Sequence, residues 1–216
     1  SRLIISRPNY KTSNRGVILM ETYKWSTMSG KLEGIPALNT DTTSNKYCQA
    51  MSKKKDTICS DCYSWEMLQT FRKNCVPRFK KNSDYLSYKV HDKEYLPKVP
   101  SNIARFNGHG ELINSNHLEN LLRICENQPK TTFTLWTKKK DLVINMLRWR
   151  SKPTNLILIY SNKYPNTIAK LPRFFDKVFN NVTFDSETIN CHRKCVECMM
   201  CYDLTDKTTI IVEKVK

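Results

Sequence analysis

The sequence predicts an α/β protein with a mostly parallel β-sheet, either open or curled into a partial (β/α) barrel, with cysteine-rich loops at the strand ends. In the middle of the chain, short apolar segments alternate with stretches whose apolar side chains recur every three or four positions. Such alternation is typical of β-α-β units, whose strands are parallel. Residues 155–160 are apolar almost throughout, which indicates a strand covered on both faces. We expect one domain over residues 1–216, with a cysteine-rich C-terminal segment at about 188–203.

The N-terminal part of the chain is less regular. Residues 3–5 and 17–20 are short apolar runs that fit strands. Residues 29–36 contain glycine and proline and indicate a loop leading to the first cysteine. Bulky side chains then recur at helical spacing, which predicts one helix over residues 62–79, entered from a cysteine-bearing loop. Residues 81–100 are polar, contain two prolines and are expected to be a connector.

The second half of the chain predicts five strands and two helices. The strands are expected at residues 103–106, 132–136, 155–160, 178–184 and 208–212. The helices are expected over residues 141–148 and from Asn114, whose side chain suits an N-cap, to Cys125. Functional side chains of parallel sheets gather on the loops after the strands. These loops begin at residues 107–111, 137–138 and 161–163.

The chain is strongly basic. Thirty-six Lys and Arg against twenty Asp and Glu give a net charge of +16. Such a charge attracts polyanions, so nucleic acid is a candidate partner, with contacts expected at residues 53–55, 138–140 and 148–150. A Lys-rich solvated surface is the alternative. The longest apolar run is far below the ~20 residues of a membrane span, so we expect no membrane partner and a cytoplasmic location. The oligomeric state is left open.

Nine cysteines provide the most specific signal. Seven of them form two groups: Cys48, Cys59 and Cys62 in the first, and Cys191, Cys195, Cys198 and Cys201 in the second. Thiolates two or three residues apart suit one soft metal ion or an iron–sulfur cluster, whereas disulfides belong to oxidising compartments. Cys75 and Cys125 stand apart and are expected to pack in the core.

The spacing favours iron–sulfur over zinc and leaves both open. Structural zinc sites usually pair two Cys-x2-Cys turns across a spacer, whereas short successive steps are typical of ferredoxin clusters. Three thiolates would leave one iron of a [4Fe–4S] cluster open to a small molecule. The second group is predicted to hold a second cluster or a zinc ion, or to fold back onto the first group.

Three features together make the sequence similar to the phage gene product 88 family. They are the stretch 30–36 with the cysteine-containing residues 59–63, the loop with Arg105, His109 and Gly110 followed by residues 134–138, and the second cysteine group with Tyr202. The resemblance spans roughly residues 30–203. It implies a phage-encoded metal or iron–sulfur protein, which would act in the host cytoplasm.

The sequence also resembles radical S-adenosylmethionine (SAM) enzymes, which use a partial α/β barrel. In that resemblance the first cysteine group, next to the aromatic Tyr63, holds a [4Fe–4S] cluster on a loop after the first strand. Gly108, Gly110 and Glu111 then lie at the end of the second strand as residues that bind SAM.

Three hypotheses about function follow. The first is an iron–sulfur protein with an open iron. If it is an enzyme, it is of radical SAM-like or Lewis-acid type, with His109 and Glu111 as candidate catalytic residues. The second is a zinc-stabilised, basic nucleic-acid-binding module without catalysis. The third is an electron-transfer protein whose clusters are fully ligated.

Overall fold

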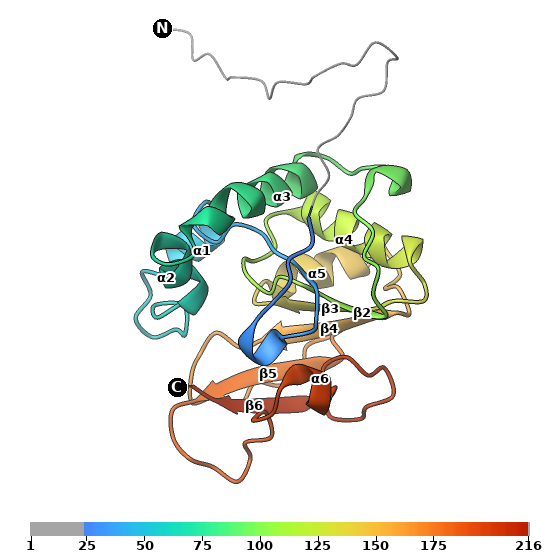
Figure 1. The fold of residues 1–216 in the computed structure, drawn as a ribbon. Coiled ribbons are helices and arrows are strands. Elements are labelled where there is room, and N and C mark those ends of the chain that lie inside the picture. The colour runs from blue at the N-terminus through green and yellow to red at the C-terminus, as the bar shows by residue number, and fades with distance from the viewer. Residues whose placement is uncertain (1–23, 216) are drawn as a thin grey trace, which may run out of the picture.

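The computed structural model describes residues 24–215 and contains an open six-stranded β-sheet (Figure 1). The strands are β1 (Ala37–Leu38), β2 (Ile103–Phe106), β3 (Thr132–Thr137), β4 (Leu156–Ser161), β5 (Lys177–Val182) and β6 (Ile210–Lys214). All five pairings are parallel, and the order across the sheet is the order in the chain. The predicted α/β class with a parallel sheet is confirmed.

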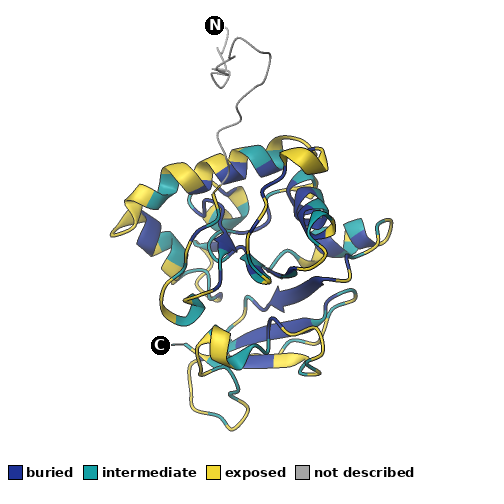
Figure 2. Ribbon diagram, turned by 45° about the vertical axis from the view of Figure 1, so that its right-hand side comes forward, coloured by how far each residue is buried: buried dark blue, intermediate teal, exposed yellow. Residues whose placement is uncertain are grey.

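The described helices cover the sheet unequally. They are α1 (Lys46–Met51), α2 (Tyr63–Gln69), α3 (Val76–Tyr88), α4 (Ser115–Asn127), α5 (Lys140–Leu147) and α6 (Cys195–Cys198), with short 3-10 turns at Gly30–Leu32, Lys73–Cys75 and Lys93–Tyr95. Buried side chains of α3, α4 and α5 pack on one face of the sheet, whereas the C-terminal segment that contains α6 packs on the other. The strands are therefore mostly buried, while the helices expose their outer sides (Figure 2).

Strand β4 shows how the two faces are filled. All six of its residues are buried. Leu156, Leu158 and Tyr160 pack with the helices, whereas Ile157 and Ile159 pack beneath the C-terminal segment. Because side chains alternate between the faces of a strand, an apolar run without polar interruptions fits a strand covered on both sides. The prediction for residues 155–160 is confirmed.

Helix α4 begins where its sequence indicates. The Asn114 side chain accepts a hydrogen bond of 3.0 Å from the backbone N–H of His117 and thereby caps the helix. Leu118, Leu121 and Leu122 recur at helical spacing, and they are at most 1% exposed. Cys125 is fully buried in the same core, as predicted.

The prediction of one helix over residues 62–79 is wrong, because the structure contains two helices there. Helix α2 ends at Gln69 and α3 begins at Val76, with Pro77 in its first turn. Proline lacks a backbone N–H and is tolerated only in the first turn of a helix. A continuous helix through Pro77 would lose a backbone hydrogen bond and clash with the preceding turn.

The connector predicted over residues 81–100 is partly wrong, because α3 continues to Tyr88. Its buried face carries polar side chains, which hid the helical pattern. Asn82 donates to the Asn39 carbonyl oxygen at 2.8 Å, and the Ser83 hydroxyl accepts from the Asp41 backbone N–H at 2.8 Å. These bonds attach α3 to the loop after β1.

The region before the first cysteine also differs from the expected loop. It contains β1, which is only two residues long, and Cys48 lies on the short helix α1. The strands predicted at residues 3–5 and 17–20 lie outside the described residues. Within residues 24–215, no helix is both long enough and apolar enough to cross a bilayer.

We expect Asp206→Asn to destabilise the fold at neutral pH. The Lys177 side chain on β5 is 3% exposed and donates to Asp206 Oδ1 and to the Thr208 carbonyl oxygen, both at 2.7 Å. Removing the carboxylate leaves a buried cation, at a cost of about 2–3 kcal/mol in unfolding free energy measured by urea denaturation. Asp185→Asn removes the exposed pair with Lys214 and is expected to cost about 0.5 kcal/mol or less.

The ion pair between Lys177 and Asp206 also predicts how the free energy of unfolding depends on pH. Burial acts to raise the pKa of Asp206, but hydrogen bonds from Lys177 and Thr208 hold that pKa below its ordinary value. The stabilisation is therefore complete above the unfolded-state pKa of about 3.9 and is lost as the pH falls below it. The difference in unfolding free energy between the parent protein and Asp206→Asn should shrink over that acidic range. A difference that does not change with pH would contradict this assignment.

Candidate metal centre

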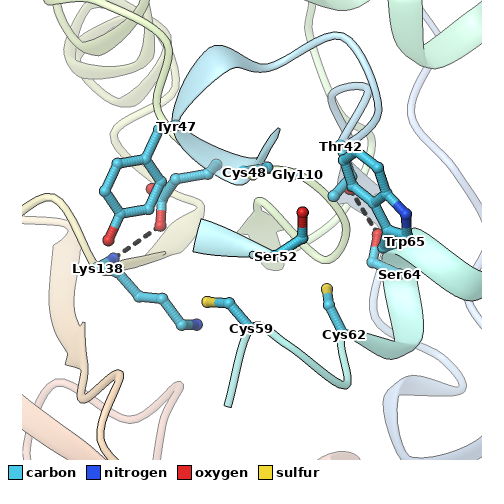
Figure 3. A pocket seen from close by; sticks show the side chains of 11 residues that line it. Thr42, Tyr47, Cys48, Ser52, Cys59, Cys62, Ser64, Trp65, Gly110 and Lys138 are labelled. Carbon is cyan, nitrogen blue, oxygen red and sulfur yellow. Dashed lines mark hydrogen bonds between the residues drawn. The ribbon is translucent and has the colours of Figure 1, made fainter. Parts of the chain in front are cut away.

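The loops after β1, β2 and β3 enclose a pocket at the carboxyl edge of the sheet (Figure 3). Its walls come from α1, the loop after α1, the start of α2 and the ends of β2 and β3. The lining residues are Thr42, Tyr47, Cys48, Ser52, Cys59, Cys62, Ser64, Trp65, Gly110, Glu111 and Lys138. All three cysteines of the first group therefore face one space.

Asn45 positions the helix that carries Cys48. Its side-chain oxygen accepts a hydrogen bond of 2.9 Å from the Tyr47 backbone N–H and caps α1. Its side-chain amide donates to the Glu111 carbonyl oxygen at 3.0 Å. A single buried side chain thus starts α1 and joins it to the loop after β2. This contact brings Cys48 to the side of Glu111 although the two residues are far apart in the sequence.

Cys59 and Cys62 are held from two sides. The backbone N–H of Ile58 donates to the Lys163 carbonyl oxygen at 2.9 Å, which joins this loop to the end of β4. Cys62 is the N-cap residue of α2, and a 2.6 Å hydrogen bond between Thr42 and Ser64 holds the first turn of that helix. Figure 3 shows the sulfur atoms of Cys59 and Cys62 pointing into the same space.

Two of the pocket thiols, Cys48 and Cys59, are held in the protonated form. Burial raises the pKa of the Cys48 thiol, and Glu111 and the neighbouring thiols raise it further, while Lys138 opposes them. Burial also raises the pKa of Cys59, and there too Lys138 acts in the opposite direction. Because metals bind thiolates, loading a metal here is expected to release protons.

The Glu111 carboxylate is fixed in orientation. It is 5% exposed and accepts hydrogen bonds from the backbone N–H groups of Leu112 and Lys138, both at 2.7 Å, and from the Thr137 hydroxyl at 2.5 Å. A carboxylate has about four acceptor positions. It therefore retains capacity for a further donor on the pocket side.

The two glycines before Glu111 differ in position. Gly110 lines the pocket and has φ +91°, and a Cβ there would lie 2.5 Å from the Thr40 carbonyl oxygen. Gly108 does not line the pocket. A Cβ at Gly108 would lie 2.8 Å from Asn39 Oδ1. Both glycines let the loop after β2 approach the loop after β1.

His109 does not line the cysteine pocket. Its ring stacks on Phe79 with centroids 5.8 Å apart, and the Tyr63 ring lies 6.4 Å away. Burial lowers the pKa of His109 to about 4, with Arg105 and Arg72 adding to the effect, so the imidazole is neutral at pH 7. The structure therefore brings Glu111 to the cysteines and leaves His109 outside that pocket.

The second cysteine group lies on the sheet face opposite α3–α5. Cys195 and Cys198 are the first and last residues of α6, and Cys191 receives support from β6 through a 3.0 Å bond between its N–H and the Val212 carbonyl oxygen. Burial raises the pKa of Cys201 to about 12, and nearby Cys191 and Cys195 raise it too. The four thiols are thus neighbours, in surroundings different from those of the first group.

In neither cysteine group do the side chains converge on one metal position. Within residues 24–215, no set of three or more His, Cys, Asp or Glu side chains is arranged to hold one metal ion. A [4Fe–4S] cluster has a different requirement, because each of its cysteines binds a different iron atom. Its ligands need to face a shared cavity, which the first group does.

Several pocket residues were not predicted as site residues. They are Thr42, Tyr47, Ser52, Ser64, Trp65 and Lys138. Only Lys138 carried a signal in the sequence, because it lies on a loop that follows a predicted strand. The others are ordinary in type and spacing, and long-range packing alone brings them to the cysteines.

The predicted nucleic-acid contacts are only partly exposed. Lys138 donates to the Ser161 hydroxyl at 3.1 Å, Lys139 donates to the Ile113 carbonyl oxygen at 2.8 Å, and Arg150 pairs with Glu119 at 2.6 Å. Residues 53–55 are exposed, and Trp149 is 90% exposed. In the predicted basic stretches 138–140 and 148–150, Lys138, Lys139 and Arg150 therefore form contacts within the fold, whereas Lys140 and Arg148 are exposed.

Comparison with protein families gives a match over most of the chain. The family model described as gene product 88 matches residues 18–206. No curated protein and no solved structure matches the chain.

Proposed function

The chain belongs to the gene product 88 family, and from the pocket shared by Cys48, Cys59 and Cys62 we propose that it is a phage iron–sulfur protein. In this proposal the three thiolates hold a [4Fe–4S] cluster and one iron is open to a small molecule. The host cytoplasm, which keeps thiols reduced, is the compartment that suits such a site.

The type and placement of the three cysteine ligands support this proposal. The three cysteines come from α1, from the loop after it and from the start of α2, so they approach one cavity from different directions. Soft thiolate ligands favour iron–sulfur clusters and zinc over hard cations. Lys138 lies at the same pocket and supplies positive charge beside an anionic cluster.

The order of the cysteine loop and the Gly110–Glu111 loop along the chain supports a finer proposal. In it, the small molecule is SAM or another compound with an amino group. The cysteine loop follows β1, and Gly110 and Glu111 follow β2, which is the arrangement that the resemblance to radical SAM enzymes implies. When bound, the cluster would supply an electron and a Lewis-acidic iron. Glu111 would accept N–H hydrogen bonds from the amino group, and Gly110 would let the loop backbone approach the ligand.

The second cysteine group is proposed to hold a second metal, either a cluster or a zinc ion. Cys191, Cys195 and Cys201 pack against the buried strands β4 and β6, and Cys198 lies near Cys195. Four thiolates complete the coordination of a structural site. This site would fasten the C-terminal segment to the sheet rather than bind a substrate.

The test is quantification of iron, acid-labile sulfide and zinc in anaerobically purified protein, with electron paramagnetic resonance after reduction. We expect about four iron and four sulfide for each cluster, and a reduced spectrum that changes when SAM is added. A spectrum indifferent to SAM would favour the electron-transfer function. Protein that carries zinc and takes up no iron or sulfide would contradict the proposal and favour the zinc-stabilised module.

A further inference from the structure

Four polar side chains meet on the sheet face that the second cysteine group covers, and each has a buried polar atom without a hydrogen-bond partner. These atoms are Arg105 Nε, Thr134 Oγ1, Trp136 Nε1 and the Tyr202 hydroxyl. Buried polar groups are nearly always paired in folded proteins. Four unpaired groups in one place therefore point to a missing partner.

The four side chains are neighbours by sheet geometry and by direct contact. Arg105 on β2 and Thr134 on β3 are register partners, so their side chains share a face of the sheet. Trp136 lies two residues further along β3 on that same face, and the Arg105 guanidinium lies 4.3 Å from the centre of its ring. Tyr202 packs on this face from the C-terminal segment, close enough for the Arg105 charge to act on its hydroxyl.

Among the described residues Arg105 has no carboxylate partner, and its charge acts on the neighbouring Cys195 and Cys201 thiols. Its side chain is half-buried, and among residues 24–215 no carboxylate forms an ion pair with it. Two other basic side chains beside this segment do have carboxylate partners, Lys31 with Glu213 and Lys177 with Asp206. A partly buried cation is stabilised when an anion accepts its hydrogen bonds.

The chemistry of the unpaired atoms sets the class of ligand. Arg Nε and Trp Nε1 can only donate hydrogen bonds, and the Thr and Tyr hydroxyls can donate as well. We propose that this cluster binds the carboxylate or phosphate group of a small molecule, with Arg105 as the principal anion contact. Arg105 and Trp136 are half-buried and provide the solvent-facing side, while Thr134 and Tyr202 close the inner side.

This site does not depend on the [4Fe–4S] cluster proposed for the first cysteine group. Its residues come from the middle of β2 and β3 and from the C-terminal segment, and none of them lines the first cysteine pocket. Because Tyr202 directly follows Cys201, and the Arg105 charge reaches the Cys195 and Cys201 thiols, binding is measured on the full chain as purified anaerobically, with its metal content determined. A failed iron test for the first cysteine group would leave this measurement intact.

The experiment is calorimetric titration of the full chain at low ionic strength with two probes, inorganic phosphate and succinate. We expect one bound probe molecule per chain, and the probe that binds more tightly identifies the group as phosphate or carboxylate. Arg105→Gln should weaken binding by about tenfold or more, because a charge-assisted hydrogen bond is lost. Tyr202→Phe keeps the packed ring and should weaken binding about fivefold.

Two controls keep the proposal falsifiable. Arg148→Gln removes an exposed guanidinium at the C-cap of α5 and should leave binding unchanged. A probe bound beside the Trp136 ring is expected to change the tryptophan fluorescence of the protein, and Trp136→Phe should abolish that change. Circular dichroism would establish that each variant folds. The proposal is overturned if neither probe binds saturably, or if Arg105→Gln and Tyr202→Phe, both folded, bind as tightly as the parent protein.

Discussion

Replacing Cys59 by serine is expected to remove one complete cluster from the protein. A serine hydroxyl is a hard donor that stays protonated, and a cluster held by only two of three thiolates is lost. Iron and sulfide should each fall by about four per chain, together with the response of the spectrum to SAM. Cys48→Ser and Cys62→Ser should have the same effect, because all three residues line the same pocket.

Cys75→Ser is the matched control for this experiment. Cys75 is half-buried like the proposed ligands but lies at the start of α3, outside both cysteine groups. It should retain the full iron and sulfide content. Cys195→Ser should affect only the second metal. If Cys59→Ser retains the iron of the parent protein, the assignment of the first group as the cluster site is wrong.

Gly110→Ala is expected to lower the free energy of unfolding by about 3 kcal/mol or more. The residue has φ +91°, which alanine rarely adopts, and its new Cβ would lie 2.1 Å from Thr40 Oγ1 and 2.5 Å from the Thr40 carbonyl oxygen. The carbonyl belongs to the backbone of the neighbouring loop, so rotating a side chain cannot relieve the clash. Urea denaturation of the metal-free protein measures the effect.

Gly30→Ala separates the cost of the positive φ from the cost of the steric clash. Gly30 also has a positive φ, +63°, but a Cβ there has nothing within 4 Å. Its replacement should cost only the backbone preference, about 1 kcal/mol. The excess cost at Gly110 then measures the close approach of the loops after β1 and β2. Equal costs for the two variants would show that this close approach does not constrain the loop.

The local pattern of the sequence was sufficient for the regular half of the fold. Strands β2 to β6 and helices α4 and α5 were predicted because each carries its own period of apolar residues or its own cap, such as Asn114. The helix over residues 62–79 was wrong for a local reason, Pro77, and the other errors fell where the pattern depended on distant partners. Asn82 and Ser83 are polar yet buried, because they bond the loop after β1, and β1 itself is too short to show a period.

The candidate metal centre was also predicted only in part from the sequence. The two cysteine groups were visible as spacings, and their chemistry was predicted from residue type alone. Their surroundings were not visible, because Glu111 and Lys138 reach Cys48 only through the parallel pairing of β2 and β3 and the Asn45 contact. Likewise, His109 is separated from the pocket by its packing on Phe79, which no spacing indicates.

The sequence by itself determined the α/β class, the alternation of strands and helices, and the presence of two groups of thiols. These properties depend on residue type and on separations of a few positions, where backbone geometry acts directly. Only the tertiary structure decided that Cys48, Cys59 and Cys62 share a pocket with Glu111, and that the Arg105 side chain lies beside Trp136 and Tyr202 with its Nε unpaired. Such contacts join residues far apart in the chain, and parallel strand pairing and core packing, rather than local preference, bring them together.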